Sequence, residues 1–116
     1  MARLRRLLPY LFWAALVFAF VVATLPRPPQ LPGAPSDKVQ HILAFTTLAA
    51  LARLAYPGVS DLRILLLLSG FGALIEVVQS IPHLHRDADF WDWLADTASV
   101  AIVLALHRLL RARRGG

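Results

Sequence analysis

The chain has no cysteine, and charged residues make up only 16% of its 116 positions. Without cysteine, neither a disulfide framework nor a thiolate metal site can form. A soluble domain usually carries about a quarter charged residues, whereas here 58% of the residues are hydrophobic and the mean hydropathy is +0.61. The composition therefore predicts an integral membrane protein, and the short length predicts a single domain over residues 1–116.

The net charge is +5, and the sequence pI is about 11.1. In a soluble protein this balance would suggest nucleic-acid binding. Here the basic residues sit at the ends of apolar runs and not along one face, and no nucleic-acid-binding motif is present. We therefore expect membrane lipids as partners and no nucleic acid.

Four apolar runs are long enough to be membrane-spanning helices, which need about 20 mostly apolar residues. The expected helices cover about residues 7–25, 37–56, 62–81 and 90–110. The first run exceeds a signal-peptide core and lacks a clean small-residue cleavage site, so it is expected to remain as an anchor. A proline-rich linker follows it, and Ser36 is then the expected N-cap of the second helix. Asp87 or Asp89 is the expected cap of the fourth helix.

The distribution of arginine and lysine predicts the orientation, because these residues favour the cytoplasmic flanks. With a cytoplasmic N-terminus, nine arginines lie inside and three basic residues lie outside. The inside set is Arg3, Arg5, Arg6, Arg53, Arg63, Arg108, Arg111, Arg113 and Arg114. The outside set is Arg27, Lys38 and Arg86. The expected fold is thus all-α, with four transmembrane helices in an antiparallel bundle and both termini in the cytoplasm.

Polar residues gather at the extracytoplasmic ends of the last three helices. Asp37 and His41 are four residues apart and share a helix face, as do Glu76 and Gln79 at a spacing of three. A charge facing lipid costs about 3 kcal/mol at the bilayer centre, so these faces should point inward. We expect one convergent polar site that opens to the outside. Its expected members are Asp37, Lys38, His41, Glu76, Gln79, Arg86, Asp92 and Asp96.

Some of these residues have simpler interpretations that the sequence leaves open. Asp37 suits the first turn of a helix, where the helix dipole favours a carboxylate. Lys38 and Arg86 suit the level of the lipid headgroups. Glu76 has the weakest alternative interpretation, because it follows ten uncharged residues from Leu66 to Ile75.

The order and spacing of these residues resemble the VanZ-like family. The motifs are Asp-Lys-x-x-His at residues 37–41, Glu-x-x-Gln at residues 76–79, an arginine at residue 86, and aspartates at residues 92 and 96. Over half of the chain carries the resemblance. Asp96 stands where asparagine is common in the family, and Ser99 stands where glycine is usual.

The resemblance implies a small multi-pass protein of the bacterial inner membrane. The namesake of the family is associated with resistance to the glycopeptide teicoplanin, but the resemblance does not establish resistance for this chain. It implies no established activity, substrate or cofactor. The family positions coincide with the convergent polar set that the residues themselves predict.

Three kinds of function fit the pattern. The first is binding or modification of an envelope component, such as a lipid headgroup or a cell-wall precursor, with Lys38 and Arg86 meeting phosphate. The second is an enzyme acting on a lipid-linked phosphate, with His41, Glu76 and Asp92 as the candidates for acid–base chemistry or for a divalent metal. The sequence contains no strong metal motif such as His-x-x-x-His, so it identifies no cofactor. The third is a small transporter, which with four helices would have to be an oligomer.

Overall fold

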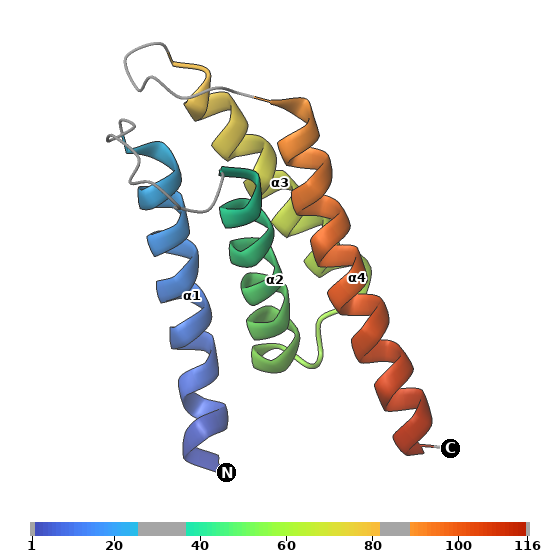
Figure 1. Ribbon diagram of the computed structural model, residues 1–116. Helices are drawn as coiled ribbons and strands as arrows, with labels where there is room; N and C mark the ends of the chain where they lie inside the picture. The colour runs from blue at the N-terminus through green and yellow to red at the C-terminus, as the bar shows by residue number, and fades with distance from the viewer. Residues whose placement is uncertain (1, 26–36, 82–88, 116) are drawn as a thin grey trace.

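The structure is a computed structural model that describes residues 2–25, 37–81 and 89–115. These residues form four α-helices and no strand, which confirms the all-α prediction. The helices are α1 (Ala2–Thr24), α2 (Asp37–Ala55), α3 (Asp61–Gln79) and α4 (Phe90–Gly115). They run alternately in opposite directions along the bundle, so the start of α1, the α2–α3 connection and the end of α4 share one end of the molecule (Figure 1).

Two helices extend further than the apolar runs predicted. Helix α1 begins at Ala2 and not near residue 7, because its arginine-rich start consists of good helix formers. Helix α4 continues to Gly115 and not to about residue 110, and Arg113 and Arg114 in its last turn interact favourably with the helix dipole. Hydropathy therefore located the apolar part of each helix but not its polar continuation.

The structure confirms one predicted helix cap and shows another that the sequence did not predict. The carboxylate of Asp89 accepts a hydrogen bond from the backbone N–H of Trp91 at 2.9 Å, so Asp89 caps α4. Ser60, which the sequence did not single out, caps α3 by accepting the N–H of Arg63 at 3.2 Å. The alternative cap at Asp87 and the expected cap at Ser36 lie outside the described residues.

Arg53 closes the connection between α2 and α3. Its side chain is buried, and its guanidinium forms an ion pair with Asp61. The same group donates hydrogen bonds to the carbonyl oxygens of Tyr56 at 2.8 Å, Pro57 at 3.1 Å and Val59. Arg53 is thus an internal anchor of the connection, a role that its count among the cytoplasmic arginines did not predict.

The distribution of apolar residues favours a membrane protein. Helix α1 and the stretch Phe90–Arg114 of α4 are each long and apolar enough to cross a membrane. Large apolar side chains are exposed on the outside of the bundle, including Phe18, Leu67 and Leu109, whereas His41, Asp92 and Asp96 are buried inside it. Apolar exteriors and polar interiors are the arrangement that a lipid solvent permits.

Helices α2 and α3 each contact the other three helices, and the contacts of α2 with α1 and α4 are the more extensive. Phe45, Leu48 and Ala49 on the inner face of α2 are almost fully buried, together with Ile75 of α3 and Val100 of α4. The first turns of α2 and α4 and the last turns of α3 meet at the end of the bundle opposite the α2–α3 connection (Figure 1). This end contains the predicted polar residues.

Candidate functional site

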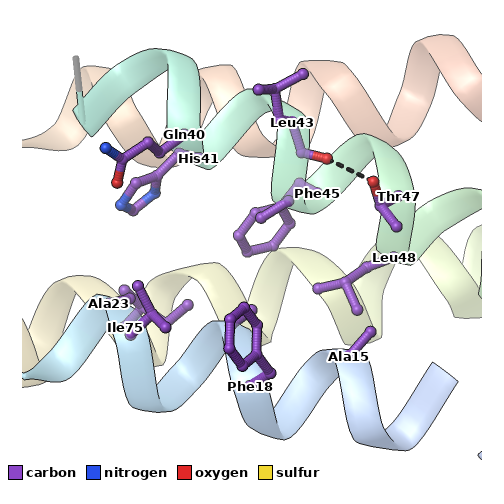
Figure 2. Close-up of a pocket in the computed structure, with 13 residues that line it drawn as sticks. Ala15, Phe18, Ala23, Gln40, His41, Leu43, Phe45, Thr47, Leu48 and Ile75 are labelled. Carbon is purple, nitrogen blue, oxygen red and sulfur yellow. Dashed lines mark hydrogen bonds between the residues drawn. The ribbon is translucent and has the colours of Figure 1, made fainter. Parts of the chain in front are cut away.

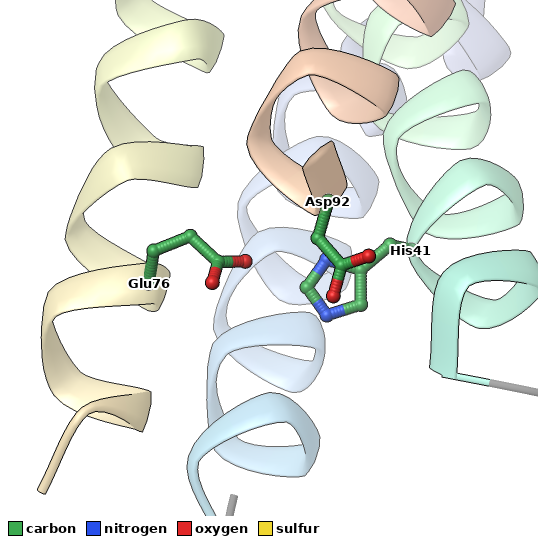
Figure 3. Close-up of side chains that lie close together, drawn as sticks. All are labelled: His41, Glu76 and Asp92. Atoms are coloured by element: carbon green, nitrogen blue, oxygen red, sulfur yellow. The ribbon is translucent and has the colours of Figure 1, made fainter. Parts of the chain in front are cut away.

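Three helices bring one side chain each to a common point at this end of the bundle. His41 comes from α2, Glu76 from α3 and Asp92 from α4, and Figure 3 shows the three side chains pointing toward one another. One potential ligand atom from each lies within 4.8 Å of the other two. We refer to these three residues, together with Lys38 and Asp96, as the polar cluster.

The imidazole of His41 is held by a buried carboxylate. Its Nδ1 lies 3.2 Å from Oδ2 of Asp96, which is completely buried, and the ring of Phe45 stacks beside it with centroids 6.5 Å apart. When Nδ1 carries the proton and donates it to the carboxylate, Nε2 retains its lone pair. The pair with Asp96 therefore leaves Nε2 as the ring nitrogen that can accept a proton or bind a ligand.

Gly72 of α3 lies beside Asp96 and Phe45. A Cβ atom at this position would lie 3.4 Å from Oδ2 of Asp96 and 3.4 Å from the ring of Phe45, which is the limit of ordinary van der Waals contact. Helix α3 therefore lies close to the His41–Asp96 pair, and small residues commonly occupy such contacts between membrane helices. Hydrogen bonds from the indole of Trp93 to the carbonyl of Ser69 and between the hydroxyls of Ser69 and Thr97 also connect α3 to α4.

Glu76 joins the cluster to the start of α4. Its Oε2 accepts the backbone N–H of Asp89 at 2.9 Å. Its Oε1 is buried and has no hydrogen-bond partner among the described residues. Buried carboxylate oxygens without partners are costly, so this atom is available for a proton donor or a cation.

The polar cluster carries an excess of negative charge. Within the described residues it contains the three carboxylates of Glu76, Asp92 and Asp96 but only one fixed cation, Lys38. The Lys38 ammonium lies 3.9 Å from Oδ1 of Asp92, and its side chain is half exposed. One partly solvated lysine offsets only part of this charge.

Gln79, which was also predicted to belong to the site, faces a different helix. Gln79 is buried, and its amide nitrogen donates to the carbonyl oxygen of Ala23 in α1 at 2.8 Å. It therefore ties α3 to α1. Arg86 and the side chain of Asp37 lie outside the described part of the chain.

An apolar groove between α1 and α2 begins at the polar cluster. Its volume is about 420 Å³. Its lining residues are Ala15, Phe18, Ala19, Val22, Ala23, Gln40, His41, Leu43, Ala44, Phe45, Thr47, Leu48 and Ile75. Figure 2 shows His41 at one end of the groove and Ala15 and Leu48 at the other.

The sequence did not predict this groove. Helix α1 was expected to be only an anchor, but its small residues Ala15, Ala19 and Ala23 form one wall. Their spacing of four residues places them on one helix face. This spacing was the available signal, although it does not reveal which helix the face meets.

Comparison with protein-family models, with curated proteins and with solved structures finds no match for this chain.

Proposed function

We propose that this chain is a bacterial inner-membrane protein of the VanZ-like type, and that its polar cluster binds the headgroup of an envelope lipid or of a lipid-linked cell-wall precursor. The observation that carries this function is the position of His41. Its imidazole belongs to the polar cluster and also lines the apolar groove. A lipid has the same two parts, a polar headgroup joined to an apolar chain, so one molecule can occupy both.

The proposed fold in the membrane has four spanning helices. Helices α2 and α3 have 19 residues each, or about 28 Å, which is close to the thickness of the hydrocarbon layer. Exposed apolar side chains continue on both, for example Leu43 on α2 and Leu66 and Leu74 on α3. The excess of arginine at the end shared by the start of α1 and the end of α4 supports a cytoplasmic location for both termini.

This topology predicts the behaviour of fused reporters. A reporter that is active only in the periplasm should be inactive when fused after Gly116 and active when inserted after Ile81, because α3 and α4 finish at opposite ends of the bundle (Figure 1). Activity would be measured in intact cells and corrected for the amount of fusion protein. Strong activity after Gly116 would overturn the orientation and would move the polar cluster to the cytoplasmic side.

Headgroup recognition should depend on the polar cluster. We expect His41→Gln and Lys38→Gln each to weaken binding of a phosphatidic acid by about tenfold, because a protonated imidazole and an ammonium donate charge-assisted hydrogen bonds to a phosphate. Binding would be measured on purified protein, with diacylglycerol of the same chains as the ligand that lacks the phosphate. His107→Gln is the matched control, since His107 lies beside the α2–α3 connection at the other end of the bundle.

Two outcomes of the binding measurement would contradict this prediction. Equal binding of phosphatidic acid by the wild type and by both His41→Gln and Lys38→Gln would remove the polar cluster as the headgroup site. Equal binding of phosphatidic acid and diacylglycerol by the wild type would remove headgroup recognition altogether.

Catalysis on a lipid-linked phosphate is the second candidate function. The observation that favours it is the His41–Asp96 pair, because an imidazole oriented by a carboxylate is a common general base. The two functions differ in one measurement on the same preparations. Release of phosphate that His41→Gln abolishes would assign an enzyme, whereas headgroup binding without release assigns a binding protein.

A further inference from the structure

We propose that His41, Glu76 and Asp92 bind one divalent metal ion, and that this ion links the carboxylates to a phosphate of the lipid headgroup. The inference deepens the proposed function and rests on it only for the phosphate. It addresses a difficulty that the cluster itself poses. A phosphate is an anion, and the described cluster already contains three carboxylates against one lysine.

The ligand atoms suit a transition-metal or zinc ion. One imidazole nitrogen and two carboxylate oxygens are a mixed set that Zn²⁺ and Mn²⁺ accept, whereas Ca²⁺ prefers six to eight oxygens. Two ligands that are each about 2.1 Å from an ion lie at most about 4.2 Å apart. The three atoms already lie within 4.8 Å of one another, so small side-chain rotations would complete the site.

The surroundings of the three ligands resemble a metal centre in two further respects. Asp96 contacts Nδ1 of His41 at 3.2 Å, and metal-bound histidines usually have such a carboxylate partner on the other ring nitrogen. Oε1 of Glu76 is buried without a hydrogen-bond partner among the described residues, and a bound ion would satisfy it.

The charge balance points in the same direction. His41 and Asp92 are each less than a tenth exposed, and Asp96 is fully buried. Carboxylates that are buried this far from water must be protonated, paired with a cation or bound to a metal. A divalent ion would offset two of the negative charges. Three protein ligands would leave coordination positions open for a phosphate oxygen.

Direct metal binding tests the inference. The full chain would be placed in phosphatidylcholine nanodiscs, stripped with a chelator and titrated with Zn²⁺ and, separately, Mn²⁺ by calorimetry, with the metal content measured after dialysis. We expect one saturable ion per chain and at least a tenfold weaker affinity in His41→Gln and Asp92→Asn. Asp96→Asn should retain one ion per chain with an affinity about 10–100-fold weaker, because it alters only the partner of the histidine.

His107→Gln should bind as the wild type does, and melting curves would show that every variant is folded. Absence of saturable binding, or binding that His41→Gln and Asp92→Asn leave unchanged, would mean an adventitious ion only and would overturn the inference. If either variant fails to fold, Asp96→Asn decides: an unchanged affinity rejects the site.

A separate measurement tests the proposed link between the metal ion and the phosphate. Chelation should reduce the preference for phosphatidic acid over diacylglycerol by at least tenfold, and added Zn²⁺ or Mn²⁺ should restore it. A preference that survives complete removal of metal would reject the link while the proposed function stands. Saturable metal binding without any headgroup preference would keep the metal site and reject the proposed lipid function.

Discussion

Ala44→Phe should weaken the binding of a long-chain phosphatidic acid by about tenfold and leave the binding of its short-chain analogue almost unchanged. Ala44 lines the groove between α1 and α2, next to Phe45 and one turn from Leu48. A phenyl ring there would occupy the space that we assign to the lipid chain. The excluded part of the chain would move into lipid and not into water, so only packing contacts are lost; about ten atom pairs at about 0.15 kcal/mol each amount to about 1.5 kcal/mol, or a factor of about 10.

The short-chain analogue and a control variant make this result specific. Ala101→Phe adds the same ring to an exposed position on α4, so it should bind both ligands as the wild type does. An equal loss for long and short chains in Ala44→Phe would show that the ring has disturbed the polar cluster. No loss for the long chain would show that the chain lies elsewhere.

Arg53→Met should lower the free energy of unfolding by about 2–3 kcal/mol, because the buried guanidinium is lost as a hydrogen-bond donor, whereas the partly exposed Asp61 keeps its ion pair with Arg108 at 3.5 Å. Methionine preserves much of the apolar part of the arginine side chain, so the loss reports on the guanidinium. Without it, Asp61 and the carbonyl oxygens of Tyr56, Pro57 and Val59 lose a common donor. Equilibrium unfolding in detergent would measure the change.

Arg63→Met is the matched control, because Arg63 is exposed near the same end of α3. Its effect should stay within about 0.5 kcal/mol, as for most surface substitutions. A second variant, Arg53→Met combined with Asp61→Leu, should recover part of the loss, since both charged partners are then removed. A loss below 1 kcal/mol in Arg53→Met would show that water or another group replaces the guanidinium.

The sequence predicted most of the polar cluster because the relevant constraint is local. Carboxylates and a histidine at helical spacing on three apolar helices leave few arrangements that avoid lipid. The structure brings together His41, Glu76, Asp92 and Asp96 from this set. It assigns Gln79 to a contact with α1, because a side chain on the correct turn can still face a different neighbour.

Features that depend on the choice of neighbouring helices were not predictable. The spacing of the small residues in α1 predicts one helix face with short side chains. It does not predict that this face meets α2. The burial of Arg53 likewise depends on the path of the chain through Pro57 and Val59, which places several carbonyl oxygens around one guanidinium. The position of Gly72 beside Asp96 and Phe45 likewise depends on how α2 and α4 pack against α3.

The open side of the groove between α1 and α2 determines the concentration scale on which its affinity for a lipid should be expressed. Phe18 and Leu43 line it and remain 69% and 59% exposed, so its side faces the surrounding medium and not the interior of the bundle. In a bilayer that medium is other lipids. An occupant would then arrive by diffusion in two dimensions and displace a neighbouring chain, so the dissociation constant is properly a mole fraction of membrane lipid. Measurements at different total lipid concentrations should agree on that scale and disagree when they are plotted against the bulk concentration of the ligand.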